Sequence, residues 1–173
     1  FSGFGGLTKG IEDAGFDTIL AANHNPYKTE VHEKNHPDAE HWIADLVDPE
    51  ASDYHSARDL PAADLLVAGV SCVNHSLANT VKAYEQGTAL FEMEDPDFDA
   101  RVTKSERDRA TANCVLHYAK HHRPRLILVE CTTQLLSWGP AMPSRPNVGD
   151  GSTYKWWLKQ FGNLNYDHNV LYL

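Results

Sequence analysis

The chain has 173 residues and a formal net charge of −9, with 42% hydrophobic and 23% charged residues. A chain of this length can bury one sizeable core, so a single domain is expected. No apolar run approaches the roughly 18 residues that a membrane-spanning helix needs, and the N-terminus lacks the layout of a signal peptide. These patterns exclude a membrane protein and favour a cytoplasmic one.

The cysteine pattern points to the same compartment. Cys72, Cys114 and Cys131 are odd in number and form no C-x-x-C pair. This argues against a disulfide framework and for a reducing environment, such as the cytoplasm of a bacterium or of a phage-infected cell. Phe1 opens directly into a glycine-rich turn without an initiator methionine, so we expect the true start of the protein to be missing.

Charge is unevenly distributed along the chain. Residues 1–100 carry 5 Lys and Arg against 19 Asp and Glu, whereas residues 101–173 carry 10 against 5. Nucleic-acid binding follows local basic patches rather than total charge. The basic part begins with Arg101 and Lys104, but on charge alone a solvated helix start is the favoured interpretation.

Apolar periodicity predicts alternating helices and strands. In chain order, the first half is expected to form a helix over 7–14, a strand over 16–22, a helix over 26–35, and strands over 41–46 and 64–70. After a long polar loop over 73–104, the second half is expected to form a helix over 105–121, a strand over 125–129, a loop over 137–152, a helix over 154–161 and a strand over 166–173.

Local signals support several of these elements. Gly15 and Gly162 are expected to end the helices that precede them. The helix over 105–121 has an apolar stripe that is expected to be buried, made of Ala112, Val115, Leu116 and Ala119. Strands that alternate with helices of this length predict an α/β fold with a parallel sheet and helices on both of its faces.

Cys72 follows the buried strand that contains Leu65 to Val70, with only Ser71 between them. The carboxyl ends of strands in such sheets are where ligands bind and chemistry happens, so a thiol there is placed as a nucleophile would be. The alternative is a small buried cysteine at a strand end, which is common.

The glycine-rich turn Gly3 to Gly6 predicts a ligand site. Glycines before a helix let the backbone approach a ligand closely. Thr8 stands where the dinucleotide fingerprint G-x-G-x-x-G requires its last glycine, and no G-K-[ST] follows, which excludes a P-loop. The turn therefore suits a smaller nucleoside-type ligand, although alone it is only suggestive.

Polar residues end the next two strands. Asn23 and His24 could hydrogen-bond a ribose, and Asp45, followed by Leu46, could accept from an adenine amine. In isolation, either pair is better explained as a cap of a helix or a turn.

Glu130 stands at the tip of the strand over 125–129. A carboxylate in a strand-end cleft is desolvated, which raises its pKa and lets it act as a general acid. A glutamate at the rim of the sheet, paired with a nearby arginine, is an equally good explanation.

Two rival kinds of site use the same residue types. Cys72, His75 and Glu130 could form a hydrolase centre, but the glycine turn and Asp45 would then have no role. The histidine pairs His32/His36 and His117/His121 have the i, i+4 spacing of zinc ligands. Neither pair has a matching set of further ligands, so surface or core histidines are the better interpretation and no metal is expected.

Together the motifs resemble the DNA cytosine-5 methyltransferase family. The F-x-G-x-G-G opening of that family is matched by Phe1, Gly3, Gly5 and Gly6. Its G-F-P-C-Q-x-F-S motif is matched in part by Gly69, Cys72 and Ser76, and its E-N-V motif corresponds to Glu130, Cys131 and Thr132. The departures, which indicate a divergent branch similar to phage and actinobacterial sequences, are Ser71, Val73, His75, Asn23 in place of a glutamate, and Cys131-Thr132.

This resemblance implies a truncated three-layer Rossmann-like sheet that binds S-adenosylmethionine. Residues 1–173 would be part of a catalytic domain without its target-recognition domain. The cofactor would lie over Gly3 to Gly6, and its adenine and ribose would contact Phe1, Asn23, His24, Asp45 and Leu46.

The resemblance also implies a mechanism on double-stranded DNA. Cys72 would attack C6 of a flipped cytosine while Glu130 stabilises the ring at N3. Ser76 and Arg101 or Lys104 would contact phosphates. A fragment that is inactive by itself and an RNA cytosine substrate both stay open as alternatives.

Overall fold

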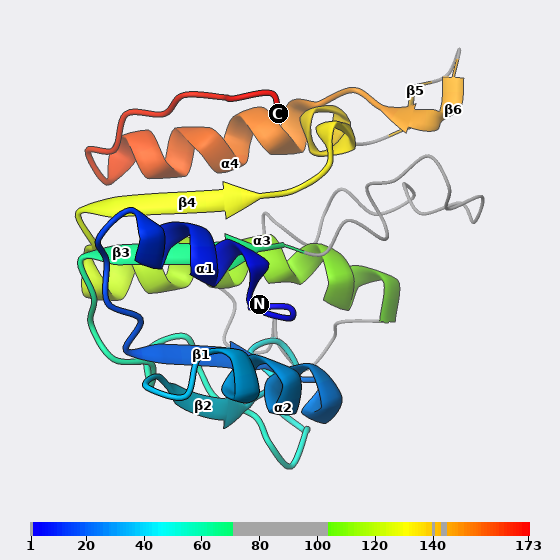
Figure 1. Cartoon of the computed structure of the whole chain (residues 1–173). Coiled ribbons are helices and arrows are strands. Elements are labelled where there is room, and N and C mark those ends of the chain that lie inside the picture. The colour runs from blue at the N-terminus through cyan, green and yellow to red at the C-terminus, as the bar shows by residue number, and fades with distance from the viewer. Residues whose placement is uncertain (1, 71–103, 140, 143–144) are drawn as a thin grey trace.

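The computed structural model of the chain describes residues 2–70, 104–139, 141–142 and 145–173 (Figure 1). Two pairs of parallel strands form its centre. β1 (Leu20–Asn23) pairs with β2 (Glu40–Ile43), and β3 (Leu65–Gly69) pairs with β4 (Leu126–Glu130). The arrows of β1, β2 and β4 point the same way in Figure 1, so both pairs end at the same side of the molecule.

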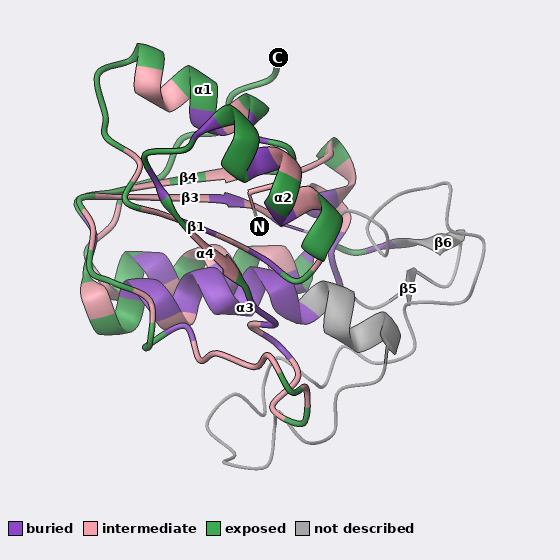
Figure 2. Cartoon of the chain, turned by 60° about the horizontal axis from the view of Figure 1, so that its bottom comes forward, coloured by how far each residue is buried: buried purple, intermediate pink, exposed green. Residues whose placement is uncertain are grey.

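Helices flank these strands on two sides (Figures 1 and 2). α1 (Gly6–Asp13) and α2 (Pro26–Asn35) lie on one side. α3 (Lys104–His122) and α4 (Ser152–Asn163) lie on the other. The fold is therefore mixed α/β with small parallel sheets. None of the helices that the structure describes is long and apolar enough to cross a membrane.

The main core lies between β3, β4 and the helices α3 and α4. Figure 2 shows α3 largely buried along the face that meets the strands. The predicted apolar stripe of this helix is confirmed, because its four members are at most 5% exposed. Trp157 of α4 completes the core: its indole N–H donates to the Ala112 carbonyl oxygen at 3.0 Å, and its ring meets Phe161 edge to face.

The ends of the first two helices follow from local sequence. Asn25 caps α2, since its side-chain oxygen accepts from the Lys28 N–H at 3.1 Å, and Pro26 takes the first helical position. Gly15, with a φ of +90°, follows the last turn of α1 as predicted. The bounds of α2 agree with the sequence prediction.

Three sequence predictions about the C-terminal part are wrong: a loop, the end of a helix and the last strand. The expected loop over 137–152 contains a short antiparallel hairpin, β5 (Ala141–Met142) and β6 (Arg145–Gly149), after a 3-10 helix η2 (Thr133–Ser137). α4 continues past Gly162, because Asn165 is the residue that takes the left-handed conformation, with a φ of +64°.

Residues 166–173 form no strand, although their alternation predicted one. A strand exists only where a neighbour supplies ladder hydrogen bonds, and none of the described strands pairs with this segment. Its apolar side chains Val170, Leu171 and Tyr172 are accordingly exposed.

Candidate functional site at the carboxyl ends of the strands

The carboxyl ends of the strands bring together residues that the sequence predicted for a site. β1 ends at Asn23, β3 at Gly69 and β4 at Glu130. The glycine turn joins them, because the Ser2 N–H donates to the carbonyl oxygen of Ala22 at 3.4 Å. Ligands of open parallel sheets bind beyond this end of the strands.

The glycine turn has one packed side and one open side. Gly3 and Gly5 have φ values of +59° and +98°, which favour glycine. A side chain at Gly5 would collide with His36, since its Cβ would lie 2.5 Å from the ring Nε2. A Cβ at Gly3 or Gly6 would meet nothing within 4 Å. The open side allows a ligand to approach the backbone closely.

α2 holds the packed side of the turn. The Asn35 side-chain N–H donates to the Phe4 carbonyl oxygen at 3.1 Å, and His36 Nε2 lies 3.0 Å from the Gly5 carbonyl oxygen. The Phe4 ring meets Tyr27 edge to face at 6.1 Å. Sequence reasoning missed this clamp, and the only signal for it was the i, i+4 spacing of two histidines at the end of a helix.

His32 and His36 are buried, so of the surface and core positions that the sequence allowed, they take the core. They are 0% and 7% exposed. Among the residues that the structure describes, no group of three or more His, Cys, Asp or Glu side chains could hold a metal ion. Cys114 and Cys131 form no disulfide within the described part of the chain.

Asn23 is buried and shapes the turn after β1. Its side-chain oxygen accepts from the Asn25 N–H at 3.0 Å, so a role toward a ligand falls to its amide nitrogen. His24 beside it is exposed. Their binding of a ribose stays a prediction.

Asp45 is also buried, and it shapes the turn after β2. Its Oδ1 accepts from the N–H groups of Val47 at 2.9 Å and Asp48 at 3.0 Å. The carbonyl oxygen of Leu46 accepts from the Cys114 thiol at 3.0 Å. These are the structural roles that the sequence left open as an alternative, and adenine recognition by Asp45 and Leu46 stays a prediction.

Glu130 is opposite Gly69 in the register of β3 and β4. Its carbonyl oxygen accepts from the Val70 N–H at 3.1 Å, so the backbone pairing continues to the residue two positions before Cys72. The side chain of Glu130 is exposed, which fits the position at the rim of the sheet that the sequence left open beside a desolvated one.

The other predicted site residues are not placed. Phe1, Cys72, Ser76 and Arg101 lie outside the described residues. Lys104 begins α3, but its side chain also lies outside what is described.

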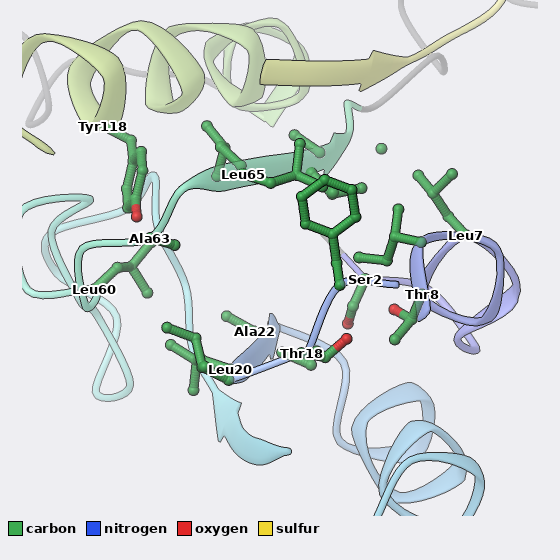
Figure 3. A pocket seen from close by; sticks show the side chains of 18 of the residues that line it. Ser2, Leu7, Thr8, Thr18, Leu20, Ala22, Leu60, Ala63, Leu65 and Tyr118 are labelled. Atoms are coloured by element: carbon green, nitrogen blue, oxygen red, sulfur yellow. The ribbon is translucent and has the colours of Figure 1, made fainter. Parts of the chain in front are cut away.

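A cavity of about 790 Å³ separates β1 from β3 (Figure 3). Leu20 to Ala22 line one wall and all of β3 lines the other, while α1 and α3 contribute further side chains such as Leu7 and Tyr118. Most of these side chains are apolar. At the carboxyl ends of the strands the cavity reaches Gly3, Gly69 and Glu130, so it is continuous with the strand-end site.

Residues 1–94 match the C-5 cytosine-specific DNA methylase family, and the chain therefore belongs to that family. The matched part contains the glycine turn, the first three strands and Cys72, but ends before α3 and Glu130.

Known relatives have similar names. The chain is 32% identical to the type II methyltransferase M.HgiBI of Herpetosiphon aurantiacus over 85 residues. This matched stretch covers 49% of this chain and 18% of the relative. It is 28% identical to the DNA-cytosine methyltransferase of Escherichia coli K12 over 102 residues. This matched stretch covers 51% of this chain and 22% of the relative. The chain thus spans about a fifth of the length of the curated relatives it matches.

Gly5→Ala should lower the free energy of unfolding by about 1–3 kcal/mol, because the left-handed backbone and the His36 ring both oppose a side chain. Gly10→Ala is the matched control: it lies within α1 with open space around it, and should be neutral or stabilising by up to about 1 kcal/mol. Urea unfolding of both variants measures the difference. Equal effects of the two substitutions would contradict the packed side of the turn.

Proposed function

We propose that this chain provides the cofactor site and the nucleophile of an S-adenosylmethionine-dependent DNA cytosine-5 methyltransferase. The observation that carries the proposal is the position of the glycine turn. The turn is open at Gly3 and Gly6, and it lies at the carboxyl ends of the strands, where Glu130 also lies. Membership of the C-5 cytosine-specific DNA methylase family supports the same reaction.

The turn fits S-adenosylmethionine in chemical terms. The open side at Gly3 and Gly6 leaves space for a nucleoside with a short charged chain, and no G-K-[ST] sequence for binding phosphates follows the turn. In this proposal Asp45 and Leu46 flank the adenine together with Phe1, and Asn23 and His24 face the ribose. When bound, the cofactor supplies the methyl group that an activated cytosine C5 takes up.

Cys72 supplies the nucleophile in this proposal. Its thiol first loses a proton to a base or to water, since the thiolate is the reactive form. The sulfur then bonds to C6 of the cytosine, and the electron pair of the C5–C6 double bond moves into the ring. Once C5 carries the methyl group it loses its proton, the C6–S bond breaks, and the thiolate is released.

Glu130 stabilises the ring while it carries the added charge. A carboxylic acid at cytosine N3 donates a hydrogen bond or a proton to the developing anion. Glu130 is exposed in this structure, so we propose that the substrate itself desolvates the carboxyl when the base enters the site.

The substrate of the proposed reaction is a cytosine in double-stranded DNA. The base must leave the stack to reach a strand-end site, at a cost of a few kcal/mol. Ser76 and Arg101 or Lys104 are the residues proposed to contact phosphates, because Ser76 follows Cys72 closely and the other two begin the basic part of the chain.

Cys72→Ser should abolish methyl transfer to a cytosine-containing duplex, because a serine hydroxyl at neutral pH is a far weaker nucleophile than a thiolate. Transfer of labelled methyl groups measures the effect, with Cys131→Ser as the matched control for the loss of another thiol. Undiminished transfer by Cys72→Ser would contradict the assigned nucleophile. Methylation of RNA but not of DNA would show that the substrate is an RNA cytosine. Inactivity of the unsubstituted chain would favour a non-catalytic fragment.

We also propose that the two strand pairs belong to one three-layer Rossmann-like sheet. Among the described strands, β1 pairs only with β2 and β3 only with β4, whereas parallel sheets normally contain more strands and are covered on both faces. The apolar cavity runs along all of β3 and most of β1. A fifth parallel strand in this cavity would join the two pairs.

A strand added at the N-terminus should stabilise the fold. Ser2 lies at the carboxyl end of β1, so an extended segment leading into Phe1 would run parallel to β1 and β3. Five apolar β-branched residues placed before Phe1 should raise the thermal midpoint by about 5 °C or more, through ladder hydrogen bonds and apolar burial. A Gly/Ser extension of the same length is the control, and equal midpoints for the two would contradict the single sheet.

A further inference from the structure

His36 lies where the end of α2 meets the glycine turn, and both of its ring nitrogens face an oxygen atom. Nε2 lies 3.0 Å from the Gly5 carbonyl oxygen, and Nδ1 lies 2.9 Å from Oε2 of Glu12 in α1. The His36 side chain is 5% exposed and the Glu12 side chain 33%, so the ring is shielded from water while the carboxylate stays partly solvated. The ring therefore bridges the turn and the helix that follows it.

These two contacts decide the protonation of the ring. A backbone carbonyl oxygen only accepts hydrogen bonds, and so does an ionised carboxylate. A neutral histidine carries a hydrogen on one ring nitrogen and so can donate only once. His36 can donate to Gly5 and Glu12 together only as the positively charged imidazolium.

Glu12 is ionised at neutral pH, as this arrangement requires. Desolvation raises the pKa of its carboxyl, but the nearby Thr18 hydroxyl, the hydrogen bond and charge of His36 and the charge of Lys9 outweigh it. The net pKa lies below the ordinary value. Lys9 itself forms an ion pair with Asp13.

His32 is the other titratable group packed against His36, with ring centroids 4.7 Å apart. Burial, followed by the positive charges of His36 and His41, lowers the pKa of His32 to about 4. His32 Nε2 lies 2.9 Å from the Thr8 hydroxyl, and Nδ1 lies 2.8 Å from Nε2 of His41 on β2. Above pH 6 the His32 ring is neutral, so it adds no charge beside His36.

We propose that the His36 imidazolium, held by Glu12, is a positioning residue that fixes the Gly5 carbonyl and so the shape of the glycine turn. Its effect on cofactor affinity rests on the proposed function. Loss of the proton leaves a nitrogen lone pair facing either the Gly5 carbonyl or the Glu12 carboxylate. One contact then becomes repulsive, and the turn loosens as the pH rises.

The pH dependence of S-adenosylmethionine affinity tests this role. Between pH 6 and 9, where His32 stays neutral, the dissociation constant of the unsubstituted chain should rise about tenfold. Glu12→Gln should remove this dependence, because the amide N–H can donate to Nδ1 of a neutral His36 whose Nε2 still donates to Gly5. Asp13→Asn removes one charge from the same helix and should keep the unsubstituted slope.

Nitrogen NMR of the ring, without cofactor, gives a second readout that does not depend on the behaviour of any variant. Both nitrogens of His36 should be protonated at pH 6, and the amide signal of Gly6 should titrate together with the ring. A neutral ring at pH 6, a flat affinity profile for the unsubstituted chain, or the same slope in Glu12→Gln would overturn the proposal. A protonated, co-titrating ring without cofactor binding at any pH would support the positioning role and contradict the proposed cofactor site.

Discussion

The parallel pairing of β3 with β4 is the constraint on which the candidate site depends. Its register places Gly69 opposite Glu130, and the hydrogen bond from the Val70 N–H to the Glu130 carbonyl oxygen extends the pairing beyond the last ladder position. α3 and α4 cover this pair with the main core, which includes Ala68 and Val70 at the end of β3. A chain that leaves this pair toward Cys72 starts from a rigid position close to Glu130.

The glycine turn forms the opposite wall of the site, and the end of α2 holds two of its backbone carbonyl groups. Asn35 and His36 donate to Phe4 and Gly5, while the first turn of α1 starts directly after them. The turn is thus held from behind by α2, and only its other side is open. This division explains why Gly5 must be glycine for packing, whereas Gly3 and Gly6 have open space for a ligand.

Sequence patterns predicted the elements that carry strong local signals. The sequence predicted the bounds of α2, where Pro26 takes the first position, and the stripe around Val115 gave the buried face of α3. They failed where tertiary contacts decide. Residues 166–173 alternate like a strand but have no neighbouring edge, and Gly162 could end a helix but does not because Asn165 does so later. The clamp by His36 could not be predicted, since its partner Glu12 lies 24 residues away and only the fold brings them together.

The central claim is that the open side of the glycine turn and the strand ends form the cofactor site. Titration of the isotope-labelled chain with S-adenosylmethionine, followed by backbone amide shifts, tests it most directly. The account predicts the largest shifts at Gly3, Gly6, Asn23 and Asp45, with α4 unaffected. Saturable binding whose shifts are confined to other surfaces, or no binding at all, would contradict it.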